Sequence, residues 1–165
     1  MTSRTTRVVI AAAVQLVLVG AAVWAPLSAR LTGEVVRLRV AAVDPVDAFR
    51  GAYVDLSYPD LPAVPDPGDG SVPPADEARG TAFVPLTRQG AHWVGGPVQR
   101  TVPEDGPYLR CDDSGWRLRC GIESLFLPQD RAAAVQDAVD AGTAVATVRV
   151  DSAGHAALLG VDVGP

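Results

Sequence analysis

The sequence contains no lysine, and all 14 of its basic residues are arginines. These arginines form no basic run anywhere along the 165 residues, and the net charge at pH 7 is −5. Nucleic-acid-binding proteins normally carry a basic stripe, so the composition argues against a nucleic-acid partner. The absence of lysine also excludes a catalytic Ser–Lys dyad.

Residues that could support catalysis or bind a metal ion are few and poorly spaced. His92 and His155 are the only histidines, and neither lies in a recognisable nucleophile motif. The carboxylate pairs Asp112–Asp113 and Glu104–Asp105 lie at turn-like positions, which explains them without acid–base chemistry or calcium. The sequence has no glycine-rich phosphate loop. We therefore predict no catalytic residue, no metal site and no cofactor.

An uncharged, apolar run covers residues 8–27. As a helix it would be about 30 Å long, which matches the hydrocarbon core of a bilayer. Gln15 is the one polar side chain in its interior, and Trp24 lies near its end, where aromatic belts form. A buried core helix and a cleaved signal peptide are the alternatives. We favour an uncleaved anchor because a good cleavage site is missing: after residues 23–25, Pro26 would directly follow the cut.

The charges around this run do not fix its orientation, since arginines lie on both sides of it, at positions 4 and 7 and at positions 30, 37 and 39. The short N-terminal tail and the two cysteines favour export of the C-terminal part. We therefore expect a single-pass protein of the cell membrane. Residues 1–29 would form a cytoplasmic tail and transmembrane anchor, and residues 30–165 one extracytoplasmic domain.

The rest of the chain shows mainly the alternating pattern of β-strands. Over residues 34–43, the side chains of Val36, Leu38 and Val40 would share a buried face, with arginines on the other. Further strands are predicted over residues 52–58, 81–87, 92–94, 97–102, 108–111, 116–120, 122–127, 143–150 and 155–163. Pro85 implies an edge or a bulge for the strand that contains it.

One helix is predicted after the apolar run, over residues 129–141. Ala132, Val135 and Val139 fall on one stripe of it, and Gly142 follows as a C-terminal cap. Residues 59–78 hold six prolines and are expected to form a loop. The predicted fold class is therefore mainly β (α+β), with one N-terminal transmembrane helix followed by a small, mostly antiparallel β domain with one packed helix.

Cys111 and Cys120 are the only cysteines, and they flank a turn predicted over residues 112–115. Cross-strand neighbours at such a turn can lie within disulfide reach, and an even cysteine count in an exported domain fits a bridge. Two buried free thiols are the alternative. A zinc site is disfavoured, because neither His92 nor His155 has a suitable spacing from the cysteines. We predict a Cys111–Cys120 disulfide.

Residues 44–58 have an unusual composition, because Arg50 and Gly51 directly precede a predicted strand that contains two tyrosines. Tyrosine combines an apolar ring with a hydrogen-bonding tip, so Tyr53 and Tyr58 suit either a half-buried sheet or a contact surface. Core packing and a tight turn at Gly51 form one interpretation. A contact site for a ligand or partner at Arg50, Tyr53 and Tyr58 is the other.

Two segments resemble one known family. Residues 51–58, Gly-Ala-Tyr-Val-Asp-Leu-Ser-Tyr, resemble the signature of the GDYXXLXY protein family, and the Asp44 and Arg50 region before it resembles that family's lead-in. Residues 121–128, Gly-Ile-Glu-Ser-Leu-Phe-Leu-Pro, resemble a second family segment. The positions that we assign to the structural motif are Asp44, Gly51, Leu56, Gly121, Ile122 and Glu123. Ala52 stands where the family has Asp, so any role of that carboxylate is absent here.

The resemblance implies a bacterial membrane-anchored protein without an assigned activity, often encoded beside polytopic membrane proteins. Our first hypothesis is therefore a non-enzymatic interaction or assembly module for a polytopic membrane protein. A ligand-binding or sensing domain with a groove around Arg50, Tyr53 and Tyr58 is the alternative. A hydrolase with an unrecognised site is a third possibility.

Overall fold

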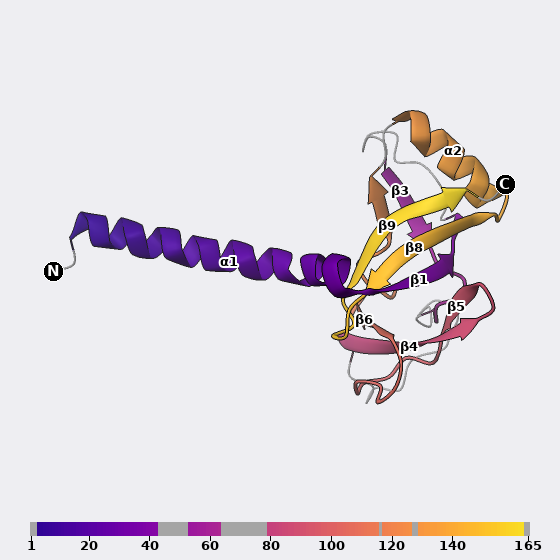
Figure 1. The fold of residues 1–165 in the computed structure, drawn as a ribbon, viewed down its shortest axis with the longest axis horizontal. Coiled ribbons are helices and arrows are strands. Elements are labelled where there is room, and N and C mark those ends of the chain that lie inside the picture. The colour runs from indigo at the N-terminus through magenta and orange to yellow at the C-terminus, as the bar shows by residue number, and fades with distance from the viewer. Residues whose placement is uncertain (1–2, 43–52, 64–78, 116, 127–128, 164–165) are drawn as a thin grey trace.

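A long helix projects from a small β domain in the computed structural model, which describes residues 3–42, 53–63, 79–115, 117–126 and 129–163 (Figure 1). Helix α1 (Arg4–Thr32) contains the predicted apolar run and extends beyond it at both ends. The Ser3 side chain caps its start by accepting a hydrogen bond from the Thr6 amide. By length and composition, α1 could cross a membrane or act as a signal sequence.

The described strands form three antiparallel sheets of three strands each, so the predicted α+β class is confirmed. The first sheet has the order β1 (Glu34–Arg39), β8 (Ala144–Val150) and β9 (Ala156–Val163). The second has the order β2 (Ala41–Ala42), β3 (Tyr53–Ser57) and β7 (Ser124–Phe126). The third has the order β5 (His92–Gly95), β4 (Thr81–Gln89) and β6 (Tyr108–Asp112).

The predicted alternation over residues 34–43 is confirmed, because Val36, Leu38 and Val40 are all buried. The segment is divided, however, into β1 and β2, which belong to different sheets. β1 pairs with β8, whereas β2 pairs with β3. The segment that follows α1 therefore links two of the sheets through β1 and β2.

Pro85 lies in the central strand of its sheet and not at an edge. On one side β4 pairs with β6 as far as Pro85 itself. On the other side its pairing with β5 stops at Leu86, the Gly96 amide donates to the Pro85 carbonyl, and the next pair is the Phe83–Gln99 bridge, one residue out of the β4–β5 register. The missing N–H of proline therefore falls at an interruption of the ladder, where it costs no strand hydrogen bond.

Two predicted strands are wrong. Residues 97–102 contribute only the bridge at Gln99, and the described residues 117–120 contribute only the bridge between Arg119 and Asp112. Pro97 cannot donate to a ladder, and Gly121 turns the chain with a left-handed φ of 81°. Both segments are therefore held by single bridges.

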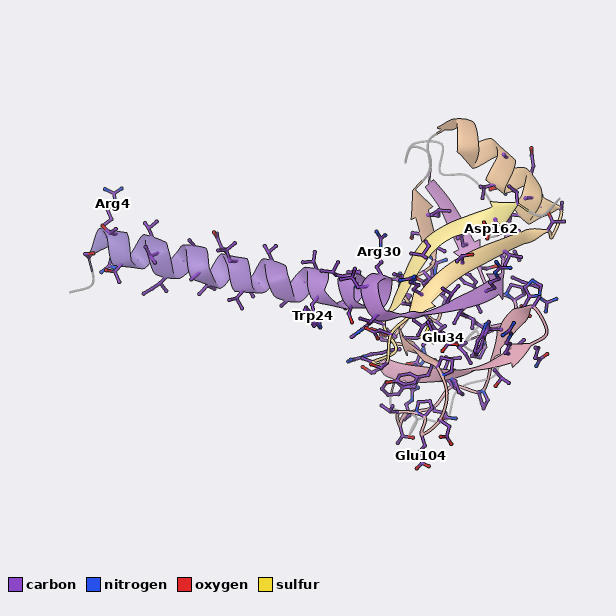
Figure 2. All side chains as sticks on the ribbon, viewed as in Figure 1. Arg4, Trp24, Arg30, Glu34, Glu104 and Asp162 are labelled. Carbon is purple, nitrogen blue, oxygen red and sulfur yellow. A yellow bond between two sulfur atoms is a disulfide. The ribbon has the colours of Figure 1, made fainter. Side chains whose placement is uncertain are left out.

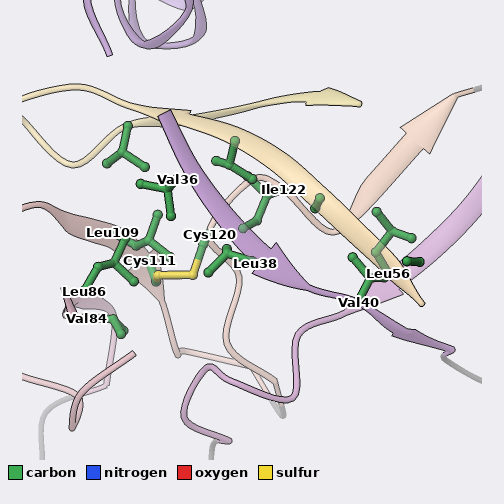
Figure 3. Close-up of a cluster of buried hydrophobic side chains, with 14 of the residues drawn as sticks. Val36, Leu38, Val40, Leu56, Val84, Leu86, Leu109, Cys111, Cys120 and Ile122 are labelled. Atoms are coloured by element: carbon green, nitrogen blue, oxygen red, sulfur yellow. A yellow bond between two sulfur atoms is a disulfide. The ribbon is translucent and has the colours of Figure 1, made fainter. Parts of the chain in front are cut away.

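The hydrophobic core lies between the sheets (Figure 3), and Val135, Ala138 and Val139 of helix α2 (Gln129–Asp140) belong to it. Its largest fully buried side chains are Leu38, Leu56, Leu109, Ile122, Val36, Val84 and Val148. Val135 and Val139 of α2 are buried as predicted. Gly142 ends the helix with a φ of 69°, and its amide donates to the Val139 carbonyl.

Candidate functional site

The two segments that carry the sequence resemblance interlock in space. Strand β3 from the first segment pairs with strand β7 from the second. The Leu56 amide donates a hydrogen bond of 2.8 Å to the Glu123 carbonyl. The Tyr58 hydroxyl donates one of 2.7 Å to the Ile122 carbonyl. We call Leu56, Tyr58, Gly121, Ile122 and Glu123 the motif joint.

The Tyr58 side chain reaches into the domain, where its hydroxyl forms a hydrogen bond. Burial, and to a smaller extent the charge of Glu123, raises the pKa of Tyr58 above its ordinary value. The phenol therefore stays neutral at physiological pH and keeps donating to Ile122. Tyr58 thus fits the structural interpretation of the motif, and its proposed role as a contact residue stays a prediction.

Glu123 fixes the turn that precedes β7. Its carboxylate accepts hydrogen bonds from the Cys120 amide and, at 3.1 Å, from the Gly121 amide. Gly121 has a left-handed φ, a conformation that side chains rarely adopt. Cys120 is bonded to Cys111 of β6, so the predicted disulfide is present and joins this turn covalently to the third sheet.

The other predicted contact and motif residues are less well placed. Arg50, Asp44 and Gly51 lie outside the described residues, and Tyr53 is described only through its backbone in β3. The role of Arg50 and Tyr53 in contacting a ligand or partner therefore stays a prediction.

An ion pair that the sequence analysis missed lies directly after the motif. The guanidinium of Arg39 on β1 binds both carboxylate oxygens of Asp60, with Nε 2.7 Å from Oδ2. The Asp60 side chain is only 6% exposed, and the hydrogen bond from Arg39 lowers its pKa. The Asp60 carbonyl also accepts a hydrogen bond from Gly95. Asp60 therefore ties the end of the motif to β1 and β5, and the Tyr-Pro-Asp turn was the available signal.

A second missed ion pair involves one of the turn carboxylates. Asp113 binds Arg100 through both oxygens, at 3.1 and 2.5 Å, and accepts a hydrogen bond from the Gly80 amide. These hydrogen bonds, above all that from Arg100, lower the pKa of Asp113. Asp112, in contrast, accepts from the Ser114 amide as an ordinary turn residue. The turn therefore explains the presence of Asp112, whereas Asp113 is explained by its ion pair with Arg100.

A hollow of about 250 Å³ lies between β1 and the β4–β5 hairpin. Its lining residues are Glu34, Val35, Arg37, Arg88, Ala91 and Trp93. It is open to solvent, and it contains none of the residues that the sequence analysis selected. Its charges are mixed, and it presents no pair of groups arranged for acid–base chemistry.

No group of three or more His, Cys, Asp or Glu side chains among the described residues could hold a metal ion. The closest approach to a catalytic arrangement joins Ser28, Asp151 and His155. The Asp151 carboxylate lies 3.1 Å from Nδ1 of His155 and also accepts a hydrogen bond from the Ser28 hydroxyl. In a hydrolytic triad the histidine contacts the serine, whereas here the carboxylate lies between them. The arrangement therefore does not activate a nucleophile.

These residues instead fasten α1 to the turn between β8 and β9. Asp151 is buried and accepts two backbone hydrogen bonds of 2.9 Å from that turn. Burial acts to raise the pKa of Asp151, but the hydrogen bonds from Ser28 and His155 lower it overall. The turn is thereby held in shape at the point where the helix meets the domain.

The last turn of α1 is itself part of the domain. Ala29 is fully buried, and Nη1 of Arg149 donates a hydrogen bond of 2.7 Å to the Arg30 carbonyl. A Cβ atom on Gly33 would lie only 2.9 Å from the Val150 amide nitrogen. We call the residues that connect helix and domain the anchor junction: Ser28, Ala29, Gly33, Arg149 and Asp151.

Comparison with known proteins gives one match. A family model described as GDYXXLXY protein matches residues 15–161, which include more than half of α1 and nearly all of the β domain. No curated protein and no solved structure matches the chain.

Proposed function

This chain belongs to the GDYXXLXY protein family, which has no assigned function, and we propose that it is a membrane-anchored interaction module. In this proposal α1 spans the cell membrane once, the β domain lies outside the cytoplasm, and the chain binds a polytopic membrane protein without catalysing a reaction. The observation that carries the proposal is the anchor junction, which continues the apolar helix directly into the domain.

The side chains of α1 support its role as an anchor. Along the helix from Arg4 to Trp24 they point outward and away from the β domain (Figure 2). Trp24 is 69% exposed, and Leu16 and Val17 are exposed to a similar degree. A core helix of a soluble protein would bury such residues, whereas a bilayer would cover them.

The buried end of the helix supports retention over cleavage. A signal peptide is removed from the mature protein. Here Ala29 is fully buried and Ser28 binds Asp151, so the end of the apolar helix contributes to the folded domain. A retained helix keeps these contacts, which favours an anchor.

The disulfide supports a location outside the cytoplasm. Disulfides persist in oxidising compartments and are rare where thiols are kept reduced. The Cys111–Cys120 bridge lies in the β domain and not in α1, so the β domain is the part that would be exported.

The motif joint supports a role in building a module over a role in catalysis. The Tyr58 hydroxyl and the Glu123 carboxylate, its main polar side-chain groups, are bound to backbone atoms inside the domain. They present no free reactive group to a substrate. We therefore assign the family motif to the stability of the domain and partner binding to other surfaces.

Two fusions test the topology. Alkaline phosphatase fused to the C-terminus should be active, and green fluorescent protein fused there should be dark. An epitope tag placed before Met1 should remain on the membrane-bound chain after an alkaline carbonate wash. A fusion that lacks residues 1–27 serves as the control and should stay in the cytoplasm. An inactive phosphatase with a fluorescent green protein would reverse the orientation, and loss of the tag would show cleavage.

Binding is tested by purification from mild detergent. The intact chain should retain a protein with several hydrophobic spans in a fixed ratio. A matched chain in which residues 8–27 are replaced by an unrelated single span should retain less of it. If neither chain retains such a protein after cross-linking in intact cells, the interaction proposal is wrong.

A further inference from the structure

One face of α1 carries polar groups that the chain itself does not satisfy. Gln15 has the only polar aliphatic side chain between residues 8 and 27, and it is exposed near the middle of that run. Its amide can donate two hydrogen bonds and accept others, yet it has no partner among the described residues. In hydrocarbon, where water is absent, such a group is costly to leave unpaired.

A second polar group on the same face lacks its usual donor. Pro26 lies inside α1 and has no N–H, so the Ala22 carbonyl loses its usual intrahelical donor. Seven residues are nearly two helical turns, so Gln15 and Ala22 lie on one side of α1, about 10 Å apart along its axis. Ala11, one turn before Gln15, is small, as is Ala22, and both would let another helix approach closely.

We propose that this polar face of α1, defined by Ala11, Gln15 and Ala22, binds a transmembrane helix of a different membrane protein. That helix would present hydrogen-bond donors at two depths about 10 Å apart, one for the Gln15 amide and one for the Ala22 carbonyl. Serine, threonine, asparagine or glutamine side chains provide such donors. The inference rests on the proposed function, because it requires α1 to span the membrane.

The anchor junction argues against a second copy of this chain as the occupant. Ala29 lies seven residues after Ala22 and continues the same face, but there it is fully buried where α1 contacts β8 and β9 of the chain's own β domain. A parallel second copy on this face would bring two β domains together at that level. It would also place one Ala22 carbonyl opposite another, which leaves both without a donor. A helix from a different protein brings no second β domain to that level, and it can place a donor opposite the Ala22 carbonyl.

Site-specific photocross-linking in intact cells tests the proposal on the full chain. The photoreactive residue p-benzoylphenylalanine is placed at Val19, one turn from Gln15 on the same face. The matched control places it at Val17, which is exposed to a similar degree but lies on the opposite side of α1. We expect an adduct from position 19 and none from position 17. Mass spectrometry should map it to a hydrophobic span with polar donors seven residues apart.

The dependence on Gln15 separates this proposal from chance proximity. Gln15→Leu should lower the yield of the adduct about three- to tenfold, the range expected for an interhelical hydrogen bond in a membrane. Gln15→Asn, which keeps an amide, should retain most of the yield.

An adduct of two copies of this chain would overturn the choice of occupant. Equal adducts from both positions, an adduct that Gln15→Leu does not weaken, or no adduct at all would overturn the polar face. The same samples are fractionated into membrane and soluble parts. A soluble chain would overturn the proposed function and this inference together, whereas a membrane-bound chain without the adduct would overturn this inference alone.

Discussion

Replacing Leu56 by alanine should destabilise the β domain strongly, because Leu56 lies at the centre of the motif joint. Its side chain is 2% exposed and belongs to the core shared by the three sheets (Figure 3). The substitution leaves the backbone hydrogen bond to Glu123 in place, so the loss comes from the side chain alone. A large-to-small change at such a site costs roughly 2–5 kcal/mol through lost burial and the residual cavity.

That cost is a large part of the roughly 5–15 kcal/mol that stabilises a typical domain. For a domain of this size it corresponds to a fall in Tm of roughly 8–20 °C. The full chain in detergent micelles, with its disulfide intact, can be melted while tryptophan fluorescence and circular dichroism are followed. Thermal and urea transitions should shift together.

Leu159→Ala is the matched control, because Leu159 on β9 is 48% exposed. Its loss should change the free energy of unfolding by only about 0.5 kcal/mol. If Leu56→Ala melts within a few degrees of Leu159→Ala, the assignment of the motif to the core is wrong. If Leu56→Ala keeps its stability but loses its partner, the motif is a binding site.

Three further predictions concern other parts of the domain. Reduction of the disulfide, which closes a loop of about ten residues, should cost about 2–3 kcal/mol, and mass spectrometry of non-reduced peptides should show the bridge beforehand. Arg100 lowers the pKa of Asp113 in the folded state, so its contribution to stability is present above the unfolded pKa of about 3.9 and is lost as the pH falls through the lower folded pKa. Urea midpoints from pH 7 to pH 3 should fall accordingly, and Asp113→Asn should weaken that fall. Gly33→Ala crowds the Val150 amide and should cost about 1–3 kcal/mol in the same melts, whereas Gly160→Ala, with open space around it, should be neutral or slightly stabilising.

Local patterns predicted most of the secondary structure. Alternation placed Val36 and Leu38 in the core, because one face of a half-buried strand must be apolar. The 3.6-residue period together with Gly142 predicted α2, and the strands predicted over residues 143–150 and 155–163 correspond to the β8–β9 hairpin. The disulfide followed from two cysteines that flank a turn. In each case the information lay within about ten residues of sequence.

The errors arose where contacts between residues far apart in the sequence determine the structure. Pro85 was expected at an edge or a bulge; it is not at an edge but in a central strand, where the register with one neighbouring segment shifts by one residue beside it. The partners of Arg39 and Arg100 lie 21 and 13 residues away, so no local pattern indicated which residues these arginines pair with. The anchor junction joins Arg30 to Arg149, a separation of 119 residues. Such contacts follow from the assembled topology and not from any segment.

No linker separates α1 from the β domain at the anchor junction, so the helix and the domain move together as one rigid body. Transmembrane helices tilt to match the thickness of the bilayer and the packing of their neighbours. Because Ala29 and the Arg149–Arg30 hydrogen bond hold the helix end, a change of tilt is not absorbed by a flexible segment there. With a domain diameter of about 30 Å, a tilt of about 10° would sweep the far side of the domain through about 5 Å. In the proposed membrane topology, a helix that packs against α1 inside the bilayer would therefore reposition the far side of the β domain, outside the bilayer.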